Sequence, residues 1–225
     1  MTVDPLDTLA RLLTAEAARV CASPAGALIV AAAACIAGSD LAAVQRLPDA
    51  AGRRHRIVLQ RGQAVELGAV PLLQLLRLAG AEPVEVGTAR ACAPDAFAAA
   101  LSTGTAAGLC LAGAEPELVD MARCVWACSA AGVPSLVLAD ATTGPLAALD
   151  AGADLVVIDV AALYGGSDAG VIAGRADLVA ACTLQERGLG ALFRATPRAV
   201  AATLEAVRAA AELAGALAMP DPVAA

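Results

Sequence analysis

Lysine is absent from this chain, and all fifteen basic residues are arginine. An arginine guanidinium stays protonated in proteins and cannot serve as the amine nucleophile that lysine provides. The sequence therefore excludes any mechanism that needs a Schiff base on a lysine of this chain.

Aromatic residues and histidine are also scarce, with two Phe, one Trp, one Tyr and one His, although 59% of the residues are hydrophobic. This composition predicts a core of small side chains in which helices lie close to a sheet. The single histidine, His55, stands in a polar segment beside Arg54 and Arg56. We expect it to be a solvated loop residue rather than half of a catalytic Cys–His pair.

The net charge of −7 shows that acidic groups outnumber basic groups. Nucleic-acid surfaces need a basic stripe that contacts phosphates, so no direct nucleic-acid partner is expected. The most membrane-like run covers residues 25–37, which is shorter than the roughly 20 residues that span a bilayer. It predicts a buried helix and no membrane segment.

Seven cysteines are present, and the first fourteen residues lack the pattern of a secretory signal. An odd cysteine count without a signal favours a reducing cytoplasm, with the thiols acting as small buried apolar groups. Cys124 and Cys128 lie one helical turn apart, but the paired spacing of zinc sites is missing. No metal site is predicted.

Short apolar strands alternate with helical segments along the chain. This rhythm predicts an α/β fold with a mostly parallel seven-stranded sheet and helices on both faces. The length fits a single domain over residues 1–225. The predicted strands are Ala17–Cys21, Ile57–Gln60, Pro83–Val86, Ala106–Leu111, Ser135–Ala139, Leu155–Ile158 and Val171–Ala173. The main predicted helices cover residues 24–37, 67–78, 94–101, 115–131 and 197–217, with another from about residue 177.

Three positions lie where ligands bind in such a sheet, beyond the carboxyl ends of strands. Ser23 could help to hold an anion, but a helix cap is favoured because Pro24 removes one amide donor. Asp140 could pair with a ligand or cap a turn, and the residues do not choose between these roles. Gly165 and Gly166 could approach a phosphate or simply form a turn.

The stretch around these glycines resembles a known family. Residues 160–170 read Val-Ala-Ala-Leu-Tyr-Gly-Gly-Ser-Asp-Ala-Gly. They resemble the segment Gly-Asp-Lys-Leu-Leu-Gly-Gly-Pro-Gln-Ala-Gly of the selenocysteine synthase (L-seryl-tRNA selenium transferase) family, whose members are fold-type-I enzymes dependent on pyridoxal phosphate (PLP). In this match Ala162 occupies the place of the cofactor lysine.

Further matches extend from about Leu13 to Arg208. Residues 60–68 read Gln-Arg-Gly-Gln-Ala-Val-Glu-Leu-Gly and resemble the family's Ser-Arg-Gly-Glu-Leu-Val-Glu-Ile-Gly. The resemblance implies a fold like the large domain of PLP-dependent transferases. It gives Asp140 the role of the acid that meets the PLP ring nitrogen. It also makes Ser23, Gly165 and Gly166 vestigial cofactor-binding residues.

The chain also departs from the family in ways that bear on function. Ala162 removes the lysine, and the residues between Leu111 and Glu115 are only Ala112-Gly113-Ala114, where the family has a longer polar loop. The family's N-terminal domain and small C-terminal domain have no counterpart in the sequence. We interpret the chain as a degenerate member without a covalently bound cofactor.

Three functional hypotheses follow. The favoured one is a non-catalytic homologue that acts as an oligomeric scaffold or accessory subunit, paired with itself or with a lysine-bearing homologue. It predicts an exposed apolar patch. The second is a module that binds PLP or another phosphorylated small molecule non-covalently, which predicts an arginine beside Asp140. The third is a transferase or lyase with a lysine-independent mechanism, which predicts a cysteine or carboxylate with a shifted pKa in a cleft.

Overall fold

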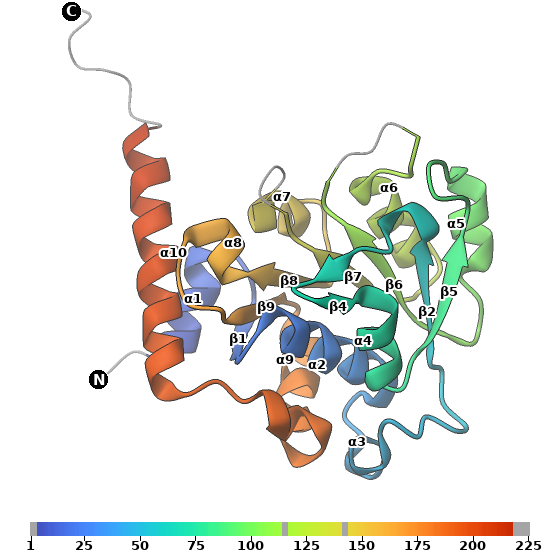
Figure 1. Ribbon diagram of the computed structural model, residues 1–225, viewed down its shortest axis with the longest axis horizontal. Helices are drawn as coiled ribbons and strands as arrows, with labels where there is room; N and C mark the ends of the chain where they lie inside the picture. Colours follow the sequence, from blue (N-terminus) through green and yellow to red (C-terminus); the bar gives the residue numbers. More distant parts are fainter. Residues whose placement is uncertain (1–3, 114–116, 141–143, 218–225) are drawn as a thin grey trace, which may run out of the picture.

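A seven-stranded sheet runs through the molecule in the strand order β1-β9-β8-β7-β6-β2-β5 (Figure 1). The computed structural model describes residues 4–113, 117–140 and 144–217. All seven predicted strands lie in this one sheet, so that prediction is confirmed. Their bounds are β1 Ala17–Cys21, β2 Arg56–Gln60, β5 Glu82–Val86, β6 Thr105–Leu111, β7 Ser135–Leu138, β8 Leu155–Asp159 and β9 Gly170–Gly174.

Most neighbouring strands run in the same direction. The pairs β2–β5, β2–β6, β6–β7 and β7–β8 are parallel, whereas β9 lies antiparallel to both β8 and β1. The carboxyl ends of β6, β7 and β8 therefore meet at one edge of the sheet, where ligands bind in α/β proteins.

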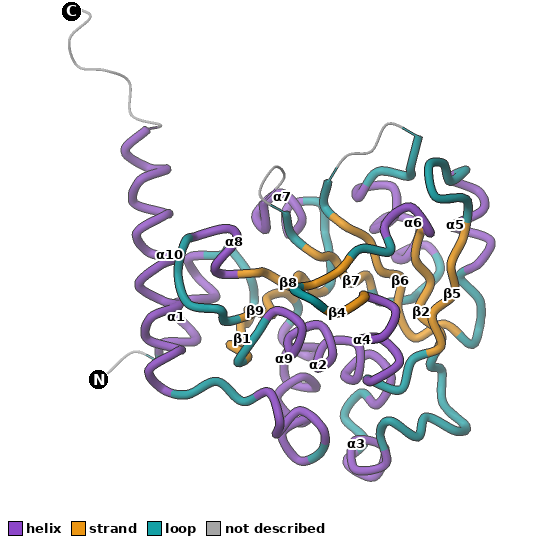
Figure 2. Tube along the Cα trace, viewed as in Figure 1, coloured by secondary structure: helices purple, strands orange, loops and turns teal. Residues whose placement is uncertain are grey.

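Helices cover both faces of the sheet, as predicted (Figure 2). Successive residues of a strand point to opposite faces, so Leu136 and Leu138 join one apolar layer while Val137 joins the other. The first layer contains α2 (Pro24–Ala37), α3 (Leu41–Arg46), α4 (Leu72–Leu78) and α9 (Ala176–Leu184). The second contains α1 (Pro5–Leu12), α5 (Pro94–Ala100), α6 (Met121–Ala130), α7 (Gly144–Asp150) and α10 (Pro197–Leu217).

Helix α2 is the most buried helix of the first layer, and every residue from Gly26 to Ala34 is buried. Its alanines leave room for close contact with β6, β8 and β9, which explains how a core with few aromatics fills its volume. The prediction of a buried helix here is confirmed. Among the helices that the structure describes, none is both long and apolar enough to cross a membrane.

Two predicted helices begin later than expected. The segment from residue 67 first forms a small hairpin, β3 (Glu66–Leu67) with β4 (Val70–Pro71), and α4 starts only at Leu72. Gly68 has φ +63°, a conformation that suits this turn. Helix α6 starts at Met121 because Asp120 accepts a hydrogen bond from the Arg123 amide and caps it. Residues 114–116 lie outside the described residues.

Candidate functional site

A cavity of about 250 Å³ opens at the carboxyl edge of the sheet. It lies between the ends of β6, β7 and β8, the hairpin segment that contains β3 and the start of α2. Asp140 and Ala162, which the resemblance placed at one site, both line it. The full lining is Pro24, Val65, Leu67, Leu111, Leu138, Ala139, Asp140, Val157, Asp159 and Ala162.

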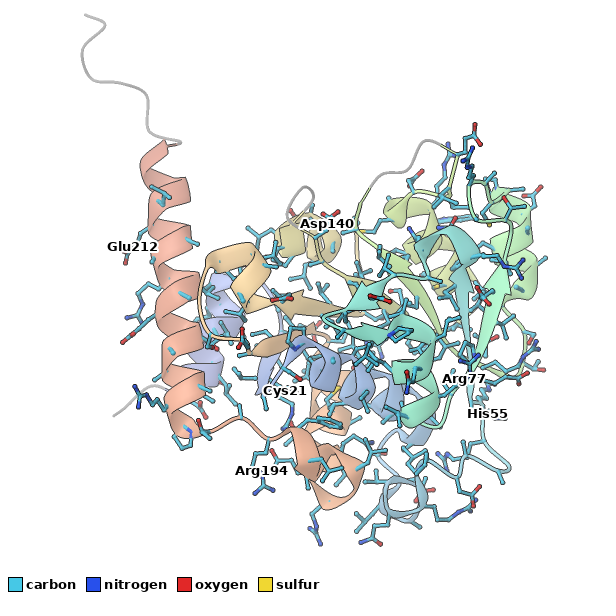
Figure 3. The ribbon with its side chains drawn as sticks, in the orientation of Figure 1. Cys21, His55, Arg77, Asp140, Arg194 and Glu212 are labelled. Carbon is cyan, nitrogen blue, oxygen red and sulfur yellow. The ribbon has the colours of Figure 1, made fainter. Side chains whose placement is uncertain are left out.

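Asp140 follows β7 and is half-buried beside α7 (Figure 3). A Cβ atom at Gly113 would lie 2.5 Å from Oδ2 of Asp140, so glycine at this position leaves room for the carboxylate. The carbonyl of Asp140 also accepts a hydrogen bond from the Gly144 amide at the start of α7. Asp140 thus lines the cavity and is bonded through its carbonyl to the first residue of α7, so both interpretations of this residue find support. Ala114, the last residue of the short loop, lies outside the described residues.

Ala162 lies in the first turn of α8 (Val160–Tyr164), directly after β8. Its amide donates to Oδ1 of Asp159 over 3.0 Å, so Asp159 caps this helix. The side chain that lines the cavity here is a methyl group, where the resemblance places an amine. Sequence reasoning did not select Asp159, although an aspartate between an apolar strand and a helix start is a usual capping signal.

Ser23 does not line the cavity. Its Oγ accepts a hydrogen bond from the Gly26 amide over 3.1 Å and caps α2. Pro24 has no N–H, and the Ala27 amide donates to the Ser23 carbonyl over 2.9 Å. Of the first three residues of α2, only Ala25 keeps an amide outside these bonds. This geometry supports a helix cap rather than an anion site.

Gly165 and Gly166 also lie outside the cavity lining. Gly165 has φ +63° and ends α8 in the left-handed conformation, with its amide donating to the Ala161 carbonyl over 3.1 Å. A Cβ atom at Gly166 would lie 2.9 Å from Cβ of Ala206 on α10. The two glycines thus shape the turn after α8 and its contact with α10, which supports the structural interpretation.

Two buried glutamines that sequence reasoning missed hold the loops at this edge. Gln60 donates to the Val119 carbonyl and accepts from the Val119 amide, both over 2.8 Å. Gln63 accepts from the Leu111 amide over 3.2 Å. A Cβ atom at Gly62 would lie 2.9 Å from the Ala89 carbonyl oxygen. The block that resembles the family's Arg-Gly-Glu motif therefore acts as structural support at the end of β2.

None of the described residues that line this cavity is a cysteine. Burial raises the pKa of the Cys35 thiol and of the Cys128 thiol, each to about 12, so both stay protonated at neutral pH. His55 lies at the other edge of the sheet, where its Nδ1 is 2.8 Å from the Arg53 carbonyl (Figure 3). Within residues 4–113, 117–140 and 144–217 no group of three His, Cys, Asp or Glu side chains could hold a metal ion.

The chain is similar to known proteins over most of its length. No protein-family model matches the chain. The chain is 34% identical over 194 residues to a 5'-C-glycyluridine monooxygenase-decarboxylase of a Streptomyces species, covering 82% of this chain and 47% of the relative. It is 28% identical over 186 residues to the D-glucosaminate-6-phosphate ammonia lyase of Salmonella typhimurium, covering 81% of this chain and 50% of the relative.

Similarity to solved structures identifies the fold of this chain. A D-glucosaminate-6-phosphate ammonia-lyase superposes with a TM-score of 0.86 at 24% identity, covering 94% of this chain and 60% of that one. The chain has a PLP-dependent transferase-like fold. A cystathionine gamma synthase from Xanthomonas oryzae shares this PLP-transferase-like fold with a TM-score of 0.66 at 17% identity, covering 91% and 49%. The relatives and structural neighbours are PLP-dependent enzymes of fold type I.

The chain spans about half the length of the curated relatives it matches. These relatives are a monooxygenase-decarboxylase and an ammonia lyase, so the narrower resemblance to selenocysteine synthases stays a prediction. The same holds for the interpretation of the chain as a degenerate member.

Because the chain has a PLP-transferase-like fold, the lining of this cavity can be compared with the groups that PLP requires. Asp140, to which the resemblance gives the contact with the ring nitrogen, lines the cavity. The chain has no lysine, and the start of α2 offers little to a phosphate. The described lining contains two carboxylates and no arginine, in contrast to the expectation of the non-covalent binding hypothesis. The described residues that line this cavity do not fit PLP.

Proposed function

We propose that this chain is a non-catalytic subunit with a PLP-transferase-like fold that acts by association, as an oligomeric scaffold or accessory subunit. One observation carries the proposal. The cavity that the resemblance implies as the cofactor site is lined by the methyl group of Ala162, and the sequence contains no lysine to replace the amine. A PLP enzyme needs that amine for its resting Schiff base.

The surface beside α10 supports association. A second cavity of about 240 Å³ lies between α1, α7, α8 and α10, and its walls are almost entirely apolar. Leu146 at this cavity is 46% exposed, and Leu213 on α10 is 63% exposed. Apolar surface of this kind is typical of protein interfaces, in agreement with the exposed patch that the scaffold hypothesis predicts.

We propose two kinds of partner: a second copy of the chain, or a lysine-bearing homologue that contributes its own catalytic groups. The sequence resemblance implies an oligomer because fold-type-I enzymes form their sites at subunit interfaces. We also propose a cytoplasmic location, since seven unpaired thiols persist best in a reducing compartment.

Native mass spectrometry of the protein purified from its own cells tests the proposal. We expect a homo-oligomer without cofactor or a complex with a lysine-bearing homologue. Borohydride reduction before the measurement fixes any PLP Schiff base as a stable mass. Because the sequence has no lysine, it offers no side-chain amine with which PLP could form a Schiff base. A homo-oligomer that retains stoichiometric PLP and turns over an amino compound would contradict the proposal.

A second candidate function is one half of a two-chain lyase or decarboxylase. Two observations favour it: the 34% identity to about half of a monooxygenase-decarboxylase, and the position of Asp140 in the cavity. In this case a partner chain supplies the lysine. Peptide mapping of a borohydride-reduced complex separates the candidates, since here the partner's PLP adduct and the activity depend on Asp140 of this chain. An accessory subunit leaves both unchanged in the Asp140→Asn variant.

A further inference from the structure

Helices α5 and α6 lie on the side of the molecule opposite α10, and α6 carries the single tryptophan of the chain (Figure 1). Trp126 is 71% exposed beside a cavity of about 270 Å³ between the two helices. We propose that this face binds the same face of a second copy, with Trp126 of each copy in the cavity of the other. The inference rests on the proposed function, because it names the surface through which the subunit associates with itself.

Trp126 lies on the solvent side of α6 because the helix packs its opposite side on the sheet. Cys124, Val125 and Cys128 are buried in the layer of α6, whereas Trp126 and Arg123, three residues apart, share the outer side. A single exposed apolar side chain is common on protein surfaces, but here a cavity and two opposite charges accompany it. Tryptophan and arginine are also the residues that most often dominate the affinity of an interface.

The cavity beside Trp126 has room for an indole ring. Phe97, Val119 and Ala127 give it apolar walls, and all three are buried. A cavity of about 150 Å³ holds benzene, so the larger indole fits into about 270 Å³. In a two-fold contact, one surface must offer both the protruding group and the space that receives it. The face formed by α5 and α6 has both.

The charges at the cavity are those of a self-complementary surface. Asp95 on α5 and Arg123 on α6 both line the cavity, so one helix brings an acid and the other a base. In the part of the chain that the structure describes, the Asp95 carboxylate has no ion pair or hydrogen bond. Nε of Arg123 lies 3.3 Å from Oδ2 of Asp120, which leaves both Nη groups to donate elsewhere. Under a two-fold axis Asp95 of each copy meets Arg123 of the other, and the pair forms twice.

A second copy suits this face better than a partner with charge of one sign. An anionic partner meets Asp95 and a cationic partner meets Arg123, so each is repelled by one of the two charges. The exposed residues around the cavity include Ala98 on α5 and Ala122 and Ala130 on α6. Their small side chains let the helices of two copies approach closely, as the core of an interface requires.

Fluorescence of the full chain at rising protein concentration tests the inference, because Trp126 is the only tryptophan. We expect its emission to shift to shorter wavelength over the concentrations at which sedimentation velocity shows a dimer forming, since association moves the indole out of water. A dimer that forms without any change in this emission would overturn the inference.

Two truncations of exposed apolar side chains locate the contact. Trp126→Ala should weaken self-association at least about thirtyfold, as truncation of an interface hot spot does. Leu213→Ala is the matched control because Leu213 is 63% exposed on α10, on the other side of the molecule. It should leave the dissociation constant within about threefold. The reverse result assigns association to α10, which overturns this inference and leaves the proposed function standing.

Exchange of the two charges tests the two-fold arrangement. Asp95→Arg and Arg123→Glu each place like charges across the contact, so each variant alone should associate at least about tenfold more weakly. An equimolar mixture of the two variants joins opposite charges at both pairs and should form a heterodimer nearly as tight as the unaltered dimer. Native mass spectrometry identifies this heterodimer by its mass, and circular dichroism checks that each variant is folded.

Absence of the heterodimer from the mixture would overturn the two-fold contact. The unaltered chain can also fail to dimerise at the highest concentration measured. If it then forms a complex only with a lysine-bearing homologue, this inference is wrong and the proposed function stands. If it remains a monomer without any partner, both are wrong.

Discussion

The cavity at the carboxyl edge of the sheet has a methyl group at Ala162, where the resemblance places the amine of the cofactor lysine. We predict that Ala162→Lys does not restore PLP capture. Ala162 is exposed at the cavity, so the longer side chain can be placed without a clash. The nearby carboxylates of Asp140 and Asp159 stabilise the charged ammonium, which is not nucleophilic, and no phosphate donors add affinity.

Ala201→Lys provides the control, because residue 201 is exposed on α10 and remote from the cavity lining. Both variants should show the same apparent affinity for PLP within about threefold, measured by visible absorbance of the Schiff base and by mass after borohydride reduction. The lysine-free background makes each new amine the only side-chain target. Capture by Ala162→Lys a hundredfold tighter than by the control would show that the cofactor site is intact.

Gly165 and Gly166 should tolerate substitution differently, because the structure needs glycine at each for a different reason. Gly165 requires a positive φ and has open space around its Cβ position, so Gly165→Ala should cost about 1 kcal/mol and Gly165→Asn less. Gly166→Ala places a methyl group 2.9 Å from Ala206 and should cost about 1–3 kcal/mol. Urea denaturation measures both, and a greater loss in Gly165→Asn than in Gly166→Ala would contradict this assignment.

At the level of single residues, the sequence was most informative where a missing residue type rules out a chemical step. The missing lysine and the cavity position of Asp140 could be predicted, because both depend on residue identity and strand order. The roles of Ser23, Gly165 and Gly166 could not be decided, because a short motif does not show which partner a hydroxyl or amide finds. Gln60 was missed because its partner Val119 lies 59 residues further along the chain. Asp159 was missed although its partner, the Ala162 amide, is only three residues away and the aspartate stands where helix caps usually stand.

Among the elements, the edge strand β1 depends on a buried ion pair. Arg19 on β1 is 5% exposed, and its Nη2 lies 2.6 Å from Oε1 of Glu186. The other carboxylate oxygen of Glu186, Oε2, is 3.0 Å from Nη2 of Arg194. The backbones of the two segments are also bonded, because the Ala22 amide, directly after β1, donates to the Phe193 carbonyl over 2.9 Å. These bonds attach the segment before α10 to the edge of the sheet and cover the exposed side of β1.

We predict that Glu186→Gln lowers the free energy of unfolding by about 3 kcal/mol at neutral pH, because Arg19 is then buried without a counter-charge. The hydrogen bond from Arg19 holds the pKa of Glu186 below its ordinary value of 4.5. The pair therefore stabilises the protein fully above about pH 5, and this stability is lost as the pH falls through the lowered pKa. Urea titrations from pH 7 to pH 3 should show the difference between the two proteins shrinking.

Arg194→Gln serves as the comparison, because the Arg194 side chain is 59% exposed and a surface pair contributes less than about 1 kcal/mol. Glu186→Gln and Arg194→Gln could lower the free energy of unfolding equally, or the loss in Glu186→Gln could be the same at pH 3 as at pH 7. Either result would show that the buried pair does not stabilise β1 in this way.

The order of the elements could be predicted from the sequence far better than their starting points. Apolar runs bounded by Gly and Pro predicted all seven strands, because a strand that is buried on both faces consists of consecutive hydrophobic residues. The starts of α4 and α6 were missed because apolar residues before them belong to the hairpin and to a loop. Helices α7 and α8 are too short to show a helical period, so only their cap residues could have indicated them.

Across the whole molecule, one sheet separates two apolar layers, and each strand contributes side chains to both. Neither layer can persist without the sheet, so we predict that residues 1–225 unfold as a single cooperative unit, in keeping with a single domain. The cysteines divide between the layers and report on each independently. Cys21 and Cys182 belong to the layer of α2, whereas Cys92, Cys110, Cys124 and Cys128 belong to the layer of α6.

Iodoacetamide labelling along a urea titration, read for each cysteine by peptide mass spectrometry, measures the unfolding of both layers in one sample. Buried thiols with raised pKa react slowly in the folded protein and rapidly once exposed, so each label marks loss of its own layer. Both sets should share one midpoint, equal to the midpoint of far-ultraviolet circular dichroism. Trp126 cannot replace them as a probe because it is 71% exposed when folded. Separate midpoints for Cys182 and Cys110 would show that the layers unfold independently and that the sheet does not couple them.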